Sequence, residues 1–145
     1  MKSIKSSRQI QADLEKVFET ISDVRNFSKA VPAITKVEFI TEQKSGAGTR
    51  FLETRKMGKR EHTCELAVTE FSENESIRIV SDAGGTVWDS IFKVRKEGEG
   101  VELTLEMEAR PHKFLAKILN PLIRGMVVKG LESDMDSVKA YCEGA

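Results

Sequence analysis

Glu53 and Arg55 are the two residues of this sequence whose types and spacing best suit chemistry. They stand two positions apart in a segment with strand-like alternation, so both side chains point to the same face of a strand. A carboxylate or guanidinium that faces an apolar pocket must be paired or used. The pair could anchor the polar end of a ligand or act in acid–base catalysis. The alternative is a cross-strand ion pair at the rim of the sheet or on its solvent face.

The other reactive side chains lack the neighbours that catalysis requires. A histidine such as His62 suits proton transfer near neutral pH, and Glu53 could lie across a hairpin from it, but spacing assigns it no acidic partner. Cys64 and Ser90 could form hydrogen bonds within a pocket, yet neither has an adjacent base or the glycines of a nucleophile elbow. We therefore expect no catalytic residue. Trp88, the sole tryptophan, could stack on a flat ligand or simply belong to the core.

Metal ions and phosphate cofactors are not expected. The two histidines and two cysteines are isolated from one another and do not form a zinc pattern. The glycine-containing turn at residues 46–49 lacks the lysine and the following helix of a phosphate-binding loop. The predicted cofactor is therefore none.

Composition points to one cytoplasmic domain, residues 1–145. Lys plus Arg and Asp plus Glu number 23 each, which disfavours nucleic acid or a membrane surface as the main partner. No apolar run is long enough for a spanning helix, so no integral membrane association is expected. The first residues lack the apolar region of a signal peptide, and two separate cysteines suit a reducing compartment. The oligomeric state stays open.

The order of elements predicts an α+β fold. A first strand, an amphipathic helical segment and one further short helical segment precede six strand-like runs between residues 37 and 109. A long amphipathic helix over residues 113–142 closes the chain. Its wide apolar stripe predicts burial against the open face of a curved antiparallel sheet of about seven strands. Pro121 predicts a kink or break in that helix. Gly125 and Gly130 either admit a close neighbour or only loosen the helix.

Alternation within the strands predicts which side chains face the helix. The run at residues 101–109 places apolar residues on one face and polar residues on the other, so one face is buried and the other is wet. The strand that carries Glu53 is ambiguous, because Leu52, Thr54 and Lys56 could form the inward row instead. The predicted lining of a cavity between sheet and helix comprises Phe51, Glu53, Arg55, His62, Cys64, Leu66, Trp88, Ser90, Phe92, Leu103, Leu105, Met107, Leu119, Ile123, Met126 and Val127.

Four stretches carry a resemblance to a known superfamily. They are Ala12–Phe18, Val31–Val37, Gly46–Phe51 and Val68–Phe71, the last followed by the strand of Trp88 and the closing helix. In this order they resemble the START-related helix-grip proteins, which include polyketide cyclases/dehydrases, coenzyme-Q-binding proteins and birch-pollen-allergen-like proteins. The resemblance implies a β-α-α-β6-α topology and a hydrophobic cavity. It implies no reaction, because fold does not determine function.

The leading hypothesis is non-covalent binding of a small hydrophobic or amphipathic molecule, such as a lipid, quinone or polyketide. The first rival is a cyclase or dehydratase-like enzyme, which requires Glu53, Arg55 and His62 to face one cavity. The second is a protein-interaction or chaperone-like role, which requires an exposed apolar patch, expected near Phe27, Val31 and Ile34.

Overall fold

The computed structural model describes residues 3–144. Its elements follow the predicted β-α-α-β6-α order, which is therefore confirmed. In chain order they are β1 (Ile4–Ile10), α1 (Leu14–Ser22), α2 (Val24–Ala30), β2 (Ile34–Phe39), β3 (Arg50–Met57), β4 (Arg60–Ser72), β5 (Ser76–Ala83), β6 (Thr86–Glu97), β7 (Gly100–Pro111) and α3 (Phe114–Cys142).

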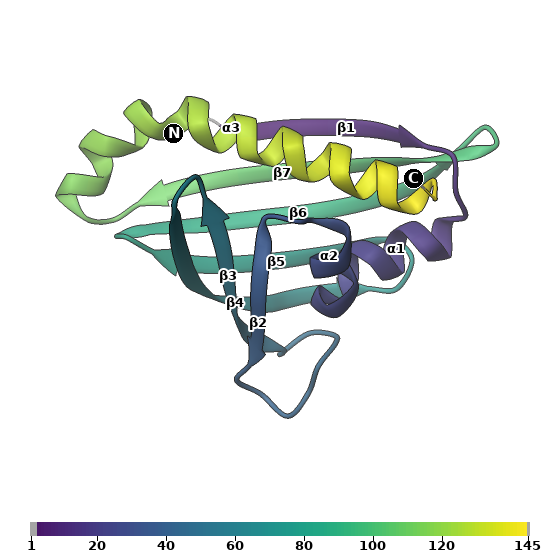
Figure 1. Ribbon diagram of the computed structural model, residues 1–145, viewed down its shortest axis with the longest axis horizontal. Helices are drawn as coiled ribbons and strands as arrows, with labels where there is room; N and C mark the ends of the chain where they lie inside the picture. The colour runs from purple at the N-terminus through teal and green to yellow at the C-terminus, as the bar shows by residue number, and fades with distance from the viewer. Residues whose placement is uncertain (1–2, 145) are drawn as a thin grey trace.

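The strands form one antiparallel sheet in the order β1-β7-β6-β5-β4-β3-β2. Every pair from β2 to β7 is joined by a hairpin, whereas β1 pairs with β7 at the far edge. Gly58 closes the hairpin between β3 and β4 with φ of 66°, a left-handed conformation that glycine adopts without steric cost. The sheet curves, and the long helix α3 crosses its concave face (Figure 1).

In β7, the side chains that face the concave side of the sheet are those that the alternation in the sequence predicts. Val101, Leu103 and Leu105 are buried there, while Glu106 and Glu108 are exposed. For β3 the structure resolves the ambiguity, because Phe51, Glu53, Arg55 and Met57 are the residues that turn toward the concave side.

The two halves of α3 differ in burial. The C-terminal half buries Leu131, Met135, Val138 and Cys142 against β1, β7, α1 and α2. The N-terminal half buries only Ala116 and Asn120. The prediction that the whole apolar stripe is covered is therefore wrong for residues 114–126. The helix continues through Pro121, but its first turns bend away from the axis of the rest (Figure 1).

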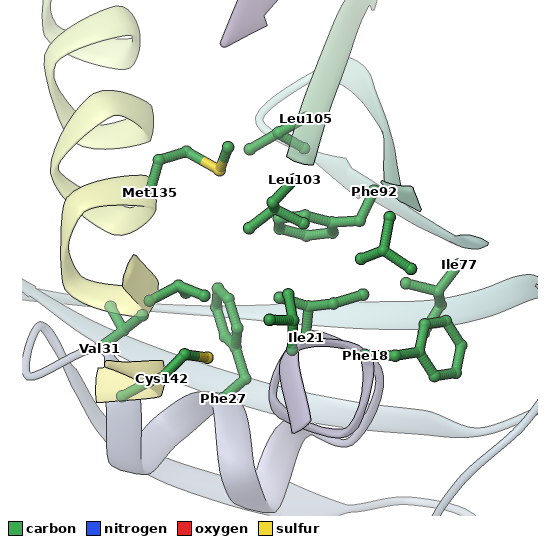
Figure 2. Close-up of a cluster of buried hydrophobic side chains, with 14 of the residues drawn as sticks. Phe18, Ile21, Phe27, Val31, Ile77, Phe92, Leu103, Leu105, Met135 and Cys142 are labelled. Atoms are coloured by element: carbon green, nitrogen blue, oxygen red, sulfur yellow. The ribbon is translucent and has the colours of Figure 1, made fainter. Parts of the chain in front are cut away.

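The packed core lies at the end of the concave face where α1 and α2 meet α3. Figure 2 shows Met135 reaching from α3 toward Leu105, with Phe27 and Ile21 rising from the two short helices. Phe27 also meets Phe92 edge-on, with ring centroids 5.8 Å apart. Side chains fill this end of the molecule, so any internal space must lie toward the middle of α3 and the strands β3 to β6.

Candidate ligand cavity

A cavity of about 350 Å³ lies between the concave face of the sheet and the middle of α3. The inward rows of β3 to β7 form its floor, the ends of α1 and α2 close one side, and α3 covers it. This volume is at the lower end of the range of roughly 300–1,000 Å³ typical of small-molecule sites. The wall is mostly aliphatic, aromatic and sulfur-containing. Two of its hydroxyls donate to backbone carbonyls, Thr49 to Gly46 and Ser81 to Glu65.

A charged cluster of Glu53, Arg55 and Asp134 stands out in this apolar wall. The Nε of Arg55 donates to Glu53 Oε1 at 2.7 Å, and its Nη1 donates to Asp134 Oδ1 at 2.9 Å. The side chains of Glu53 and Asp134 are only 12% and 16% exposed. Because strand β3 supplies two members and helix α3 the third, the cluster ties the sheet to the helix that covers the cavity.

The charge of Arg55 is stabilised by its two partners. Burial alone would lower the pKa of Arg55, but the hydrogen bond that Arg55 donates to Asp134 and the charges of Glu53 and Asp134 outweigh it, so the pKa lies above its ordinary value. The guanidinium therefore stays protonated, and the cluster combines one fixed cation with two carboxylates. An apolar site with few convergent polar groups is the usual design of a pocket that binds and orients a small molecule.

The register of the β3–β4 hairpin places Cys64, not His62, opposite Glu53. His62 stands opposite Arg55, close to the hairpin end, where it is exposed. Cys64 lines the cavity beside Glu53. Burial raises the pKa of the Cys64 thiol, the charge of Glu53 raises it further, and Arg55 partly opposes both. The thiol form is therefore favoured, which does not suit a nucleophile.

The structure places most of the predicted lining residues on the cavity wall. Those on it are Phe51, Glu53, Arg55, Cys64, Leu66, Trp88, Ser90, Phe92, Leu105, Met107, Met126 and Val127.

Four predicted lining residues lie elsewhere. His62 is exposed beyond the rim, and Leu103 is fully buried in the packed core. Leu119 is 49% exposed, and Ile123 is partly exposed and absent from the wall. The last two differ because α3 covers the cavity further along its length, from Met126 to Asp134.

Asp134 is the main cavity residue that the sequence reasoning missed. A signal for it exists, because Val127, Leu131, Asp134 and Val138 follow one another at intervals of four, three and four residues. This spacing places a carboxylate within the buried stripe of the helix. A charge in such a position indicates a partner on the opposing sheet, which is Arg55. The neighbouring basic residues of the hairpin, Lys56, Lys59 and Arg60, are exposed instead.

Metal sites and membrane spans are not found in residues 3–144. Within that range no group of three or more His, Cys, Asp or Glu side chains is placed to hold a metal ion. In the same part of the chain, no helix is both long and apolar enough to cross a bilayer.

The exposed apolar surface differs from the expected one. The patch expected near Phe27, Val31 and Ile34 is not exposed, because all three side chains are buried. Most of the exposed large apolar residues lie instead in the N-terminal half of α3.

Comparison with known proteins identifies the family. The sequence model of the family described as polyketide cyclase / dehydrase and lipid transport matches residues 1–143. Among curated proteins, none matches the chain significantly in sequence.

Solved structures show the same fold at low sequence identity. TTHA0849 from Thermus thermophilus has a TM-score of 0.77 at 17% identity, with 95% of this chain and 94% of that one covered. Ara h 8.0201 has a TM-score of 0.79 at 12% identity and 99% coverage of both chains. The di-domain ARO/CYC BexL from the BE-7585A biosynthetic pathway has a TM-score of 0.80 at 12% identity, and the match covers 99% of this chain but 50% of BexL. The predicted helix-grip fold and family resemblance are thereby confirmed.

Proposed function

The chain belongs to the polyketide cyclase/dehydrase and lipid transport family, and from this premise we propose that it binds a small, mostly apolar molecule in the cavity beneath α3. The observation that carries the proposal is the cavity of about 350 Å³ itself, whose apolar wall holds one charged cluster. We propose the whole of residues 1–145 as one binding domain. The separate free thiols of Cys64 and Cys142 support a reducing compartment such as the cytoplasm.

The charged cluster defines which ligands fit. Arg55 has N–H groups beyond those that bind Glu53 and Asp134, so a carbonyl or phenolate oxygen of a guest can accept from it. The two carboxylates can accept from a guest hydroxyl. The rest of the guest must be apolar, because burying an unpaired polar group costs free energy. Quinones, polyphenols and folded polyketides have this combination, and a simple alkane does not.

Native mass spectrometry of freshly purified protein tests this proposal first, followed by thermal shift against a panel of lipids, quinones and polyphenols. A bound guest stabilises the fold to an extent that grows with its concentration relative to its dissociation constant. We expect a co-purifying mass or a rise in Tm with at least one oxygenated aromatic class. If the guest no longer raises the Tm of Arg55→Met but still raises that of the exposed control Lys93→Met, the guest binds at the charged cluster. A flat response across the panel and no bound mass would contradict the proposal.

A cyclase-like activity is a second candidate, favoured by the di-domain ARO/CYC proteins among the similar folds and by the cluster. Aldol cyclisation needs a base that removes a proton from a carbon next to a carbonyl, and a donor that holds the carbonyl oxygen. Glu53 or Asp134 would be the base and Arg55 the donor. His62 is excluded from this role, because it lies outside the cavity.

The enzyme candidate has its own test. A soluble poly-β-ketone analogue incubated with the protein would give a cyclised, dehydrated product that mass spectrometry detects. Glu53→Gln and Asp134→Asn would each slow its formation by a larger factor than they weaken binding of the analogue. If the analogue binds but no more product forms than in the absence of the protein, the enzyme candidate is rejected and the binding function stands alone.

A further inference from the structure

The N-terminal half of α3 presents an apolar face to solvent. Its side chains are Phe114, Leu115, Ile118, Leu119, Leu122 and Met126, which we call the helix face, and each is between 49% and 76% exposed. Elsewhere in residues 3–144, large apolar side chains reach at most 44%, at Met57. Soluble proteins seldom expose so many adjacent apolar residues unless the surface binds something.

The charged residues of the chain segment that carries the helix face all have one sign. Between Glu108 and Glu132 the sequence contains no acidic residue, while the exposed Lys113, Lys117 and Lys129 belong to the same segment as the helix face. The overall neutrality of the chain conceals this separation of charge. Such a combination of exposed apolar side chains and basic residues is typical of helices that lie in the interface of a bilayer. From it we propose that the helix face docks the protein on membranes containing anionic lipids.

A second copy of the chain does not fit this surface. Self-association through the helix face would bring Lys117 and Lys129 toward the same residues of the partner, and like charges at an interface are unfavourable. An anionic bilayer instead supplies an apolar layer for Phe114 and Leu122 with phosphate groups above it for the lysines. Charge complementarity therefore favours the membrane as the occupant.

The helix face is held in place before any docking occurs. Asn120, on the opposite side of the helix, donates from Nδ2 to Thr86 Oγ1 at 2.9 Å, and both residues are buried. Ala116 is buried one turn earlier. These contacts anchor the first half of α3 to the beginning of β6, so its apolar residues project outward as a preformed surface.

The helix face also borders the cavity. Met126 belongs to it and lines the cavity wall, and the exposed Met57 of the β3–β4 hairpin lines the same cavity. Docking would thus bring the cavity rim to the bilayer, where an apolar guest could exchange between lipid and protein. This exchange step depends on the proposed ligand binding, whereas the docking itself does not.

Vesicle flotation tests the docking. The wild-type protein is mixed with vesicles of phosphatidylcholine alone or of phosphatidylcholine with phosphatidylserine, at low and high salt. We expect flotation with the phosphatidylserine vesicles and much less with the neutral ones or at high salt, because salt screens the lysines. Phe114→Ser/Leu122→Ser and Lys117→Glu/Lys129→Glu should each weaken binding by roughly tenfold or more. Ile40→Ser, an exposed apolar residue elsewhere, should bind as the wild type does.

Several results would overturn the proposal. The wild-type protein could fail to float with either kind of vesicle, or it could bind both kinds equally. The serine double variant could also bind as strongly as the wild type. Light scattering that finds a dimer which the serine double variant abolishes would assign the helix face to a second copy instead. Circular dichroism checks that the variants are folded. Binding of a soluble guest should persist in the serine double variant, so failure of docking and failure of ligand binding are distinguishable.

Discussion

The guanidinium of Arg55 pairs with both carboxylate oxygens of Asp134, with Nη1–Oδ1 at 2.9 Å and Nη2–Oδ2 at 2.8 Å. This two-point contact joins β3 to α3 across the cavity. Planar pairing of this kind fixes orientation as well as distance. The same side chain therefore positions the helix over the cavity and provides its polar end, so its loss should affect both stability and binding.

Replacement of Arg55 by methionine should lower the free energy of unfolding by about 1–3 kcal/mol, because it leaves Glu53 and Asp134 as neighbouring carboxylates without their cation. Arg55→Lys should recover only part of this loss, since an ammonium cannot contact both oxygens in the same fixed geometry. Urea denaturation at neutral pH measures the effect. Removing Asp134 as well, in Arg55→Met/Asp134→Leu, should restore some stability. An Arg55→Met variant as stable as the wild type would show that the cluster does not hold the helix.

The outer face of the sheet contains a second charged group, centred on Asp89. Arg78 donates to its two oxygens at 2.8 and 2.5 Å, and Arg110 donates at 3.0 Å. The hydrogen bond from Arg78 is the main cause that lowers the pKa of Asp89, against the opposing effect of burial. Because the pKa of Asp89 is lower in the folded state, its ionised carboxylate stabilises the protein fully when the pH is above about 4, the pKa of an unfolded aspartate. This stabilisation is lost as the pH falls through the pKa of the folded state.

Asp89→Asn should therefore destabilise the protein at neutral pH, by roughly 1–3 kcal/mol, and the difference from the wild type should shrink below about pH 4. Urea titrations across this pH range measure the difference. Glu106→Gln, which neutralises an exposed carboxylate on the same face, is the matched control and should change little. A difference that stays constant down to low pH would exclude the ionised Asp89 as its source.

Cys64 reports on the cavity through its reactivity. Because burial and Glu53 raise the pKa of this thiol, it should react with a small alkylating reagent more slowly at neutral pH than an unstructured cysteine, and faster as the pH rises. Cys142→Ser removes the other thiol and keeps a hydroxyl for the bond to Thr20. Glu53→Gln should increase the rate. Rapid labelling of Cys64 at neutral pH, unaffected by Glu53, would contradict the position assigned to it.

Much of the fold follows from local pattern. The alternation of β7 assigns its buried face correctly because every second residue of an antiparallel strand faces the core. The periodicity of the C-terminal helix predicts its start to within one residue of Phe114. Periodicity alone cannot decide the face of β3, because both rows mix polar and apolar residues. It also cannot show that the N-terminal half of α3 leaves its apolar residues exposed, since a stripe reports which side is apolar and not what covers it.

The candidate site is harder to predict than the fold. The pairing of Glu53 with Arg55 is visible in the sequence, but Asp134 comes from a helix distant in the chain, and its distance to Arg55 depends on tertiary packing. The expectation that Glu53 could lie across the hairpin from His62 is wrong, because the two-residue turn at Gly58 pairs Met57 with Arg60 and thereby moves the position opposite Glu53 two residues along β4. Cys64 takes the position opposite Glu53.

Two glycines should respond in opposite directions to alanine. At Gly125, in the exposed half of α3, an added Cβ would meet no atom within 4 Å, so Gly125→Ala should stabilise the protein by about 1 kcal/mol through helix propensity. At Gly58, φ is 66°, and Gly58→Ala should destabilise it by about 1–2 kcal/mol. Thermal or urea unfolding of the two variants checks both signs. A destabilised Gly125→Ala variant would mean that the helix requires the conformational freedom of glycine at this position.

The most direct test of a guest-accepting cavity uses Trp88, the sole tryptophan and a residue of the wall. Its fluorescence is titrated with an oxygenated aromatic compound identified by thermal shift. The wild type and Ile91→Phe, altered at the neighbouring residue on the outer face, should show saturable quenching with the same Kd. Ser90→Phe, which fills the cavity from its floor, should remain folded and show none. Equal quenching in all three proteins would place the guest outside the cavity and contradict this account.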